Sequence, residues 1–268
     1  MKDSILVLFT CFNRKKITGR AVRQLSSQYK NISFLIVDDG STDGTDKILQ
    51  KRKNVEMIKT KGNCYYTASM RYGMDYLKKS KKTYDYLLLI NDDVNFYDGI
   101  LEKMIAFSKE KNGVVVGATV DDQENVSYGG ILFRTPGTSH FLRVGPEFQE
   151  ELDTCNGNCV LIPYSYFLNT DIMDKHYSHG FGDFDYGLAL KRNGYSLYMF
   201  PEFIGKCNRN SLEGTYHDKK LSLFKRLQLK RKPKGLPFME YFHYNYKNFG
   251  FQVAVRMTIW TYKDMIRK

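Results

Sequence analysis

Hydrophobic residues between positions 5 and 90 follow two alternating patterns. Short apolar runs are typical of strands buried in a parallel sheet. Such strands are predicted at 5–10, 33–37, 55–59 and 86–90. Apolar residues three or four positions apart predict helices between them, at 14–29, 42–51 and 63–79. Because strands and helices alternate, we expect an α/β fold with a parallel sheet and right-handed crossovers.

The pattern after residue 90 is more mixed. Strand-like runs occur at 113–120, 159–163 and 195–200. The segments 126–133 and 140–144 are predicted to pair as a hairpin around Pro136-Gly137. A helix is expected at 181–193, where Gly194 stops it, and a break in the pattern follows at 208–214.

Acidic residues directly follow two of the predicted strands. Asp38 and Asp39 come after one strand, and Asp92 and Asp93 come after the most hydrophobic one, YLLLI. Ligands of open parallel sheets bind outside the carboxyl ends of the strands. Both acidic pairs are therefore expected at a ligand-binding edge.

The run Asn91-Asp92-Asp93 predicts a divalent cation site. Adjacent carboxylates repel each other unless a cation or water screens them. Mg²⁺ and Mn²⁺ favour oxygen ligands of this kind and leave room for substrate phosphates. A solvated loop whose acids cap a helix is the alternative, and the position directly after an apolar strand favours the metal site.

The segment Asp38–Asp43 predicts a nucleotide contact. A carboxylate can accept a hydrogen bond from the imide N–H of uracil or thymine, or from ribose hydroxyls. The alternative is a turn in which Ser41 or Thr42 caps the next helix. Both roles are compatible.

Two further acids, Asp183 and Asp185, stand at the start of the predicted helix after Gly180 and Gly182. The positive end of a helix favours ionised carboxylates. An ionised carboxylate near an acceptor hydroxyl can serve as general base. Helix capping alone is the simpler alternative.

Taken in order, several segments resemble one enzyme family. They are FTCFNR, IVDDGSTDGT, KGNCYYTASMRYGM, LLLINDDV, HGFGDFDYGLALKRNGY and PKGLPFMEYFHYNYKNFG. Together they span nearly the whole chain, and it resembles an inverting family 2 glycosyltransferase of the GT-A fold. The third and last segments resemble the branch that builds bacterial capsule or O-antigen polysaccharides, including rhamnosyltransferases.

The resemblance implies roles for individual residues. Asp38 would contact the base, and Asp92 would lie close to the ribose or the metal. Asp93 would hold the metal, with His217 as a candidate further ligand, and Asp183 would be the general base. Further nucleotide-sugar contacts are expected from Thr10, Asn13, Asn63 and Arg71.

The chain departs from the family pattern at two places. Asn91 stands where the family often has an acid, which leaves fewer carboxylates for a metal. Gly182 stands where the family often has Glu before the catalytic Asp. This second departure leaves Asp185 open as an alternative base.

The activity implied by the resemblance is a single displacement at the anomeric carbon, with inversion. A divalent metal, Mn²⁺ or Mg²⁺, would stabilise the departing nucleoside diphosphate. The donor would be a UDP- or dTDP-sugar and the acceptor a glycan linked to polyprenyl diphosphate. Residues 1–218 would form the catalytic domain, with a donor half at 1–112 and an acceptor half at 113–218.

The net charge of +12 is concentrated at one end of the chain. Residues 219–268 hold 13 Lys/Arg and two acids, whereas residues 1–218 are nearly balanced. The stretch 219–234 has eight Lys/Arg, no acid, and Leu221, Phe224 and Leu227 at helical spacing. This pattern predicts a helical segment on an anionic membrane surface, with aromatic residues beyond it as an interfacial belt. A solvated helix packed on the body is the alternative.

Five scattered cysteines do not form a disulfide framework, and no apolar run reaches 18 residues. The apolar run Ile5–Phe9 is too short for a signal segment. We therefore expect a cytoplasmic protein, peripheral on the inner face of the plasma membrane. A homodimer is compatible with the sequence.

Three other functions are alternatives. The sequence pI of about 9.3 suggests nucleic-acid binding, but the balanced body shows no nucleic-acid-binding motif, so no such partner is expected. A nucleotidyltransferase would usually need a glycine-rich phosphate loop near the first strand, and Thr10–Arg14 is not glycine-rich. A non-catalytic nucleotide-sugar-binding protein stays open because of Gly182.

Overall fold

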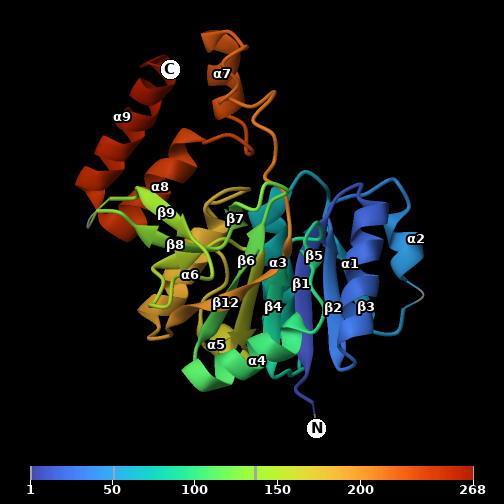
Figure 1. Cartoon of the computed structure of the whole chain (residues 1–268). Coiled ribbons are helices and arrows are strands. Elements are labelled where there is room, and N and C mark those ends of the chain that lie inside the picture. Colours follow the sequence, from blue (N-terminus) through green and yellow to red (C-terminus); the bar gives the residue numbers. More distant parts are fainter. Residues whose placement is uncertain (1, 51, 136–137, 268) are drawn as a thin grey trace.

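A mixed but mostly parallel sheet forms the centre of the computed structural model, which describes residues 2–50, 52–135 and 138–267 (Figure 1). Its first half is parallel, in the order β3-β2-β1-β4. These strands span Ile5–Cys11 (β1), Ile32–Asp38 (β2), Val55–Lys59 (β3) and Tyr86–Ile90 (β4). The helices between them are Lys15–Gln28 (α1), Thr45–Leu49 (α2) and Tyr65–Lys79 (α3). The expected α/β fold is confirmed, with α2 shorter than predicted.

The second half of the sheet mixes directions. Here β11 (Cys159–Pro163) runs antiparallel to both β4 and β6 (Val114–Val120), and β12 (Leu197–Lys206) runs parallel to β6. The short strands β5 (Asn95–Phe96) and β7 (Val126–Tyr128) pair with β12 and β6. The prediction that this last long strand ends at residue 200 is wrong. A register shift between Met199 and Phe203 accommodates Pro201, so the strand continues.

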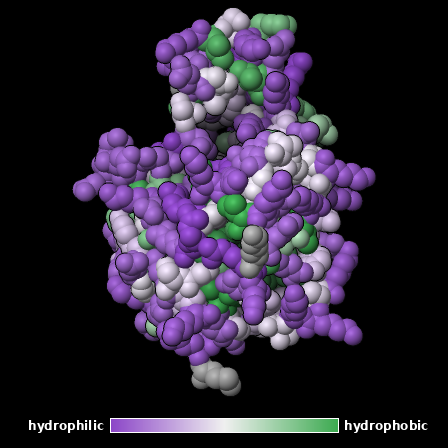
Figure 2. Space-filling model, turned by 90° about the vertical axis from the view of Figure 1, so that its right-hand side faces the viewer, coloured by the Kyte–Doolittle hydropathy of each residue, from purple (hydrophilic) through white to green (hydrophobic). Residues whose placement is uncertain are grey.

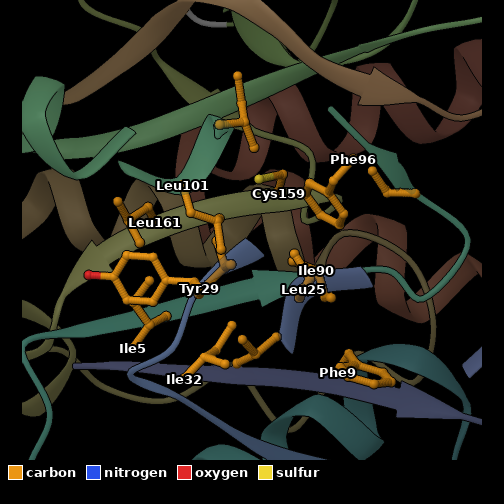
Figure 3. Packing of buried hydrophobic residues seen from close by; sticks show 14 of the residues in the cluster. Ile5, Phe9, Leu25, Tyr29, Ile32, Ile90, Phe96, Leu101, Cys159 and Leu161 are labelled. Atoms are coloured by element: carbon orange, nitrogen blue, oxygen red, sulfur yellow. The ribbon is translucent and has the colours of Figure 1, made fainter. Parts of the chain in front are cut away.

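Helices cover both faces of the sheet, which explains the continuous apolar runs. Along β1, Ile5, Val7 and Phe9 point to one face, where they pack with residues of α1 and α4 (Ile100–Lys111), as Figure 3 shows in part. Leu6 and Leu8 point to the other face and pack with α3, α5 (Tyr164–Asn169) and α6 (Gly182–Arg192). Burial on both sides explains why Ile5–Phe9 is apolar at every position.

A small second sheet stands beside the main one. It has the order β10-β8-β9, with β10 at Thr154–Cys155, β8 at Gly130–Phe133 and β9 at Phe141–Val144. The predicted hairpin is confirmed for 130–133 with 141–144, but 126–128 pairs with β6 instead. Gly129 allows this change of partner, since a Cβ there would lie 2.5 Å from the carbonyl oxygen of Val144. The expected turn at Pro136-Gly137 lies outside the described residues.

Three helices end the chain: α7 (Leu223–Lys230), α8 (Phe238–Phe249) and α9 (Phe251–Arg267). They stand on the side of the sheet where the parallel strands end (Figure 1). Tyr244 of α8 is buried beside Phe184 of α6, so α8 is anchored to the body. No helix among the described residues is long and apolar enough to cross a bilayer.

Candidate active site

Asp92 lies at the carboxyl end of β4 and is almost fully buried. Its Oδ1 is 2.7 Å from Nη1 of Arg14, and its Oδ2 accepts a hydrogen bond from the Thr18 hydroxyl at 2.7 Å. Burial raises the pKa of Asp92, and the positive charge of Arg14 opposes that shift. Asp92 is thus held by its own neighbours and has little contact with solvent.

Asp93 is more accessible, with its side chain 31% exposed. Its Oδ2 lies 2.9 Å from Nη2 of Arg14, and its Oδ1 accepts from the Cys207 thiol at 3.7 Å. Arg14 therefore neutralises both adjacent carboxylates. The mutual repulsion from which the sequence predicted a cation is balanced here by a guanidinium.

Asp38 lies at the end of the neighbouring strand and is fully buried. Its Oδ1 accepts from the backbone N–H of Ser41 at 2.8 Å, whereas its Oδ2 is buried and has no hydrogen-bond partner among the described residues. An unsatisfied buried carboxylate oxygen costs free energy and is rare in native proteins. Asp92 Oδ1 also has no hydrogen bond among the described residues, but it has the Arg14 guanidinium beside it, whereas Asp38 Oδ2 has neither a hydrogen bond nor an ion pair there.

Asn13 and Thr10 shape the walls around Asp38. The backbone N–H of Asn13 donates to the Ser41 hydroxyl at 2.9 Å, and its side-chain oxygen accepts from the N–H of Thr42 at 2.8 Å. Asn13 adopts a φ of 51°, in the left-handed region that Asn tolerates. The Thr10 hydroxyl donates to the carbonyl of Val37. Asn13 thus joins the first two strand–helix loops, and Thr10 joins the ends of β1 and β2.

Asp39 was not assigned a role separate from Asp38, and the structure gives it one. Its two oxygens accept the backbone N–H groups of Cys64 and Tyr65, each at 3.0 Å, and the Thr60 hydroxyl. It therefore anchors the amino end of α3. Asn63, expected to contact the nucleotide-sugar, lies exposed just before that helix with a φ of 58°.

Arg71 was expected to contact the nucleotide-sugar, but in the structure it is hydrogen-bonded to backbone carbonyls. Its Nη1 donates to the carbonyls of Asp174 and Tyr177 at 3.0 and 3.1 Å. It also lines a cavity of about 600 Å³ together with Lys59 and Lys61. Its role toward a donor stays a prediction.

Asp183 lies in the first turn of α6, as predicted, against the loop before β11. Its Oδ2 accepts from the N–H of Gly157 at 2.9 Å and its Oδ1 from the N–H of Phe184 at 2.9 Å. Burial raises the pKa of Asp183, and hydrogen bonds, including one from the Asn156 side chain, act in the opposite direction. A carboxylate of this kind holds a proton more readily than an exposed one, so it suits proton transfer.

Asp185 has a different environment. It is buried, and its oxygens lie 2.7 Å from Lys247 Nζ and 3.0 Å from Asn248 Nδ2, both on α8. With these partners Asp185 joins α6 to α8. The structure therefore favours Asp183 over Asp185 as the acid available for chemistry.

A cavity of about 780 Å³ lies between the body and the C-terminal helices. Asp183 and Asn156 line it from the body, and Tyr216, Lys230 and Trp260 line it from the C-terminal side. The acid is therefore at the wall of a space large enough for part of a substrate.

Arg143 and Tyr128 connect the two acidic regions, and neither was predicted. The Arg143 guanidinium lies 5.8 Å from the Tyr128 ring centre, and its Nε donates to Asn156 at 3.0 Å. Burial raises the pKa of Tyr128, with Cys207 and Asp93 adding to the shift. Burial lowers the pKa of Arg143, and the negative charges of Tyr128 and Asp183 oppose this shift. Both acids thus act on one aromatic–cation pair.

His217 lines the same cavity as Asp183 and packs against the Tyr216 ring, 3.9 Å between centroids. Among the described residues, the group of three side chains close enough to share a metal ion is Asp174, His176 and His243, which includes neither Asp93 nor His217. The role of His217 as a metal ligand stays a prediction.

A family model for glycosyl transferase family 2 matches residues 6–168, more than half of the chain. The chain belongs to glycosyl transferase family 2. The match includes both strand-end acidic clusters, whereas Asp183, His217 and the C-terminal helices lie beyond it.

This family 2 chain was compared with known proteins in sequence and in fold. It is 24% identical over 216 residues to the Bacillus subtilis (strain 168) protein EpsE, and the alignment covers 77% of this chain and 73% of EpsE. The mannosyltransferase PcManGT from Pyrobaculum calidifontis, solved with GDP-Man and Mn²⁺, superposes with a TM-score of 0.58 at 12% identity. That superposition covers 97% of this chain and 74% of PcManGT.

Two larger enzymes share the fold over part of their length. S. aureus TarS superposes with a TM-score of 0.57 at 12% identity, over 77% of this chain and 37% of TarS. GalNAc-T7, solved with UDP, GalNAc and Mn²⁺, gives 0.57 at 13% identity, over 74% of this chain and 42% of that protein. The family 2 chain therefore spans well under half of these two proteins.

Proposed function

We propose that this chain transfers a sugar, with inversion, from a nucleotide-diphospho-sugar to an acceptor hydroxyl during bacterial cell-surface polysaccharide synthesis. The donor is a UDP- or dTDP-sugar, so the enzyme is a hexosyl- or rhamnosyltransferase. The observation that carries the proposal is the Asp183 carboxylate, which stands at the wall of a cavity and at the start of a helix. Family membership supports the reaction class.

The base of the donor is proposed to bind at Asp38. The unsatisfied Oδ2 of Asp38 is a ready acceptor for the imide N–H of uracil or thymine. Asn13 holds the adjoining loop in place through Ser41 and Thr42, so the loop need not be ordered anew when the base enters. The base gains access by a small displacement of this loop, because the oxygen is closed to solvent in the free chain.

A divalent cation, Mn²⁺ or Mg²⁺, is proposed to bind at Asp93. The residues fit such an ion, since Asp93 is a partly exposed carboxylate just after β4, and its charged partner among the described residues is the partly exposed side chain of Arg14. Asp92 fits poorly as a ligand, because it is buried and both its oxygens are engaged. The ion would stabilise negative charge on the departing diphosphate. His217 is kept as a candidate further ligand.

Asp183 is proposed to take the proton of the acceptor hydroxyl. Each carboxylate oxygen has two acceptor sites, so the bonds from Gly157 and Phe184 leave room for the hydroxyl. These two N–H groups also fix the carboxylate in one orientation. The proton leaves the acceptor oxygen as that oxygen attacks the anomeric carbon from the side opposite the diphosphate, which gives inversion.

The C-terminal segment 219–268 is proposed to contact an anionic membrane that carries a polyprenyl-diphosphate-linked acceptor. Exposed apolar side chains are frequent on it, among them Phe224 (71% exposed), Met239 (72%) and Ile266 (67%). Figure 2 shows hydrophobic patches among hydrophilic side chains on the upper lobe, which these helices form. Exposed basic residues on and around α7, among them Lys220, Lys225 and Arg231, supply the attraction to anionic lipid.

Liposome flotation tests the membrane contact. Removing the whole segment would also remove Lys247 from Asp185, so point variants are preferable. Replacing Leu223 and Phe224 by Ser should reduce binding to vesicles containing anionic lipid. Leu168→Ser, on the body and 45% exposed, is the matched control and should leave binding unchanged. Equal flotation of both variants would contradict the proposal.

A thermal-shift screen of nucleotide-sugars, with and without Mn²⁺, tests the donor. A ligand bound to the folded state alone raises the melting temperature with its concentration relative to Kd. One UDP- or dTDP-sugar should stabilise the chain most, and more so with Mn²⁺. No stabilisation by any nucleotide-sugar at millimolar concentration would contradict the proposed function.

A further inference from the structure

Lys230 is a buried lysine at the C-terminal end of α7, with 1% of its surface exposed. Lysine is almost never fully buried unless it is paired with an acid. Within the described part of the chain, its ammonium makes no hydrogen bond or ion pair, and Asp264 is the acid that acts on it electrostatically. The ammonium is therefore held in the folded state without the partner that such burial normally requires.

Two tyrosine rings flank the ammonium of Lys230. Its Nζ lies 4.9 Å from the centre of the Tyr216 ring and 4.9 Å from that of Tyr262. Cation–π contacts recover part of the lost hydration. They leave a net cost, because burial lowers the pKa of Lys230 to about 8 even though Asp264 opposes the shift.

Lys230 lines the same cavity as Asp183. Arg226 and Lys219 line it too, and Arg226 is fixed by donating from Nε to the carbonyl of Tyr216 at 2.9 Å. The C-terminal wall thus carries basic and aromatic side chains with one acid, Asp264, while the carboxylate proposed as base stands on the body side. An entering molecule would meet the cation at one end and Asp183 at the other.

We propose that the Lys230 ammonium, in its cage of Tyr216 and Tyr262, is an anion-binding subsite for a phosphate group of the acceptor. The proposal deepens the proposed function, on which it rests for the identity of the cavity as the acceptor site. A phosphate supplies the negative charge that the buried ammonium lacks. The tyrosine rings hold the ammonium in place before the ligand arrives, which reduces the entropic cost of binding.

The phosphate has two possible sources, a lipid diphosphate or a soluble phosphate. The tyrosines and Trp260 give the cavity wall apolar surface beside the cation, which favours a ligand with both a phosphate and an apolar chain. A soluble phosphate would use the cation alone. The affinities of farnesyl diphosphate and inorganic pyrophosphate therefore distinguish the two.

Trp260 provides a direct readout that does not depend on catalysis. It is the only tryptophan of the chain, and it lines the cavity. Its fluorescence is titrated with farnesyl diphosphate, farnesol and inorganic pyrophosphate. Farnesyl diphosphate should bind most tightly, and farnesol should bind at least tenfold more weakly. Pyrophosphate binding as tight as farnesyl diphosphate, with the same need for Lys230, would support the subsite and assign it to a soluble phosphate.

Variants on one helix assign the effect to Lys230. Lys230→Met should weaken farnesyl diphosphate binding at least tenfold and leave farnesol binding unchanged, whereas Lys230→Arg should retain most of the binding. Lys225→Met, on the exposed face of α7, is the matched control and should behave like the native chain. Circular dichroism verifies that each variant folds, and the Arg variant preserves the test if the Met variant does not.

Two results would overturn the subsite. One is equal affinity for farnesyl diphosphate in the native chain and the Lys230→Met variant. The other is farnesol binding as tight as that of farnesyl diphosphate. Donor binding, measured by thermal shift on the same samples, separates this failure from that of the proposed function. A chain that binds nucleotide-sugar but shows no Lys230-dependent anion binding loses only the subsite.

Discussion

Arg14 pairs with Asp93 across 79 positions of sequence, with 2.9 Å between Nη2 and Oδ2. The same guanidinium lies 2.7 Å from Asp92. A guanidinium and a divalent cation neutralise the same carboxylates, so they compete for Asp93. We infer that Arg14 keeps the acidic pair stable in the free chain and swings aside when metal and diphosphate arrive.

Replacing Arg14 by Gln tests this competition. Loss of the guanidinium leaves buried Asp92 without its cation, so the free energy of unfolding should fall by about 3 kcal/mol. Mn²⁺ should then raise the melting temperature more than it does in the native chain, because no guanidinium competes. Arg20→Gln is the control, since Arg20 only reaches the carbonyl of Asp93 at 3.3 Å. An unchanged response to Mn²⁺ would contradict the competition.

Asp39 should prove structural. The Asp39 carboxylate accepts hydrogen bonds from three donors. In Asp39→Asn, the new amide N–H₂ would face at least one of these donors and could not accept its hydrogen bond. We expect a loss of about 2 kcal/mol in the free energy of unfolding, measured by urea denaturation. Asp98→Asn, at an exposed position, should change it by less than about 0.5 kcal/mol. Equal stability of the two variants would argue against the anchor at α3.

The acid side of the pH–rate profile should report Asp183. As a base it must be ionised, so kcat/KM falls when the pH drops through its pKa, which burial raises above 3.8. Asn156 donates a hydrogen bond that lowers this pKa. Asn156→Ala should therefore move the acid limb to higher pH. A limb that stays in place or moves to lower pH would contradict the assignment.

Lys230 should make stability depend on alkaline pH. Its pKa is about 8 in the folded chain against 10.5 for the ordinary side chain, so the unfolded chain binds more protons between these values. Stability contributed by this residue therefore rises as the pH increases from about 8 to 10.5. Over this interval, the melting temperature of the native chain minus that of Lys230→Met should increase. A constant difference between the two would mean that the ammonium is not desolvated.

The strands of the first half were predicted well from the sequence, because a strand that is buried on both faces has a continuous run of apolar residues. Helix α4 was not predicted, although Ile100, Leu101, Met104 and Ile105 carry the helical spacing. The extension of β12 past Pro201 was missed because a bulge, which has no sequence signature, removes the need for that proline's N–H.

The candidate site was predicted in part. Acids at strand ends and at a helix start can be read locally, and the structure places Asp38, Asp93 and Asp183 at such positions. Their roles stay predictions. The partners of the acids cannot be read locally, because Arg14 meets Asp93 from 79 positions away and Lys247 meets Asp185 from 62. Only the fold therefore shows that Asp185 is engaged and that Arg14 occupies the acidic pair.

Sugar transfer by Asp183→Asn, compared with the native chain, tests the central claim most directly. The isosteric amide keeps the size of the side chain and removes the base. Asp185→Asn is the companion variant, expected to lose stability through Lys247 while the remaining folded enzyme stays active. Asp183→Asn should lose at least about a thousandfold in transfer rate and bind nucleotide-sugar as the native chain does. Native turnover by Asp183→Asn would contradict the claim.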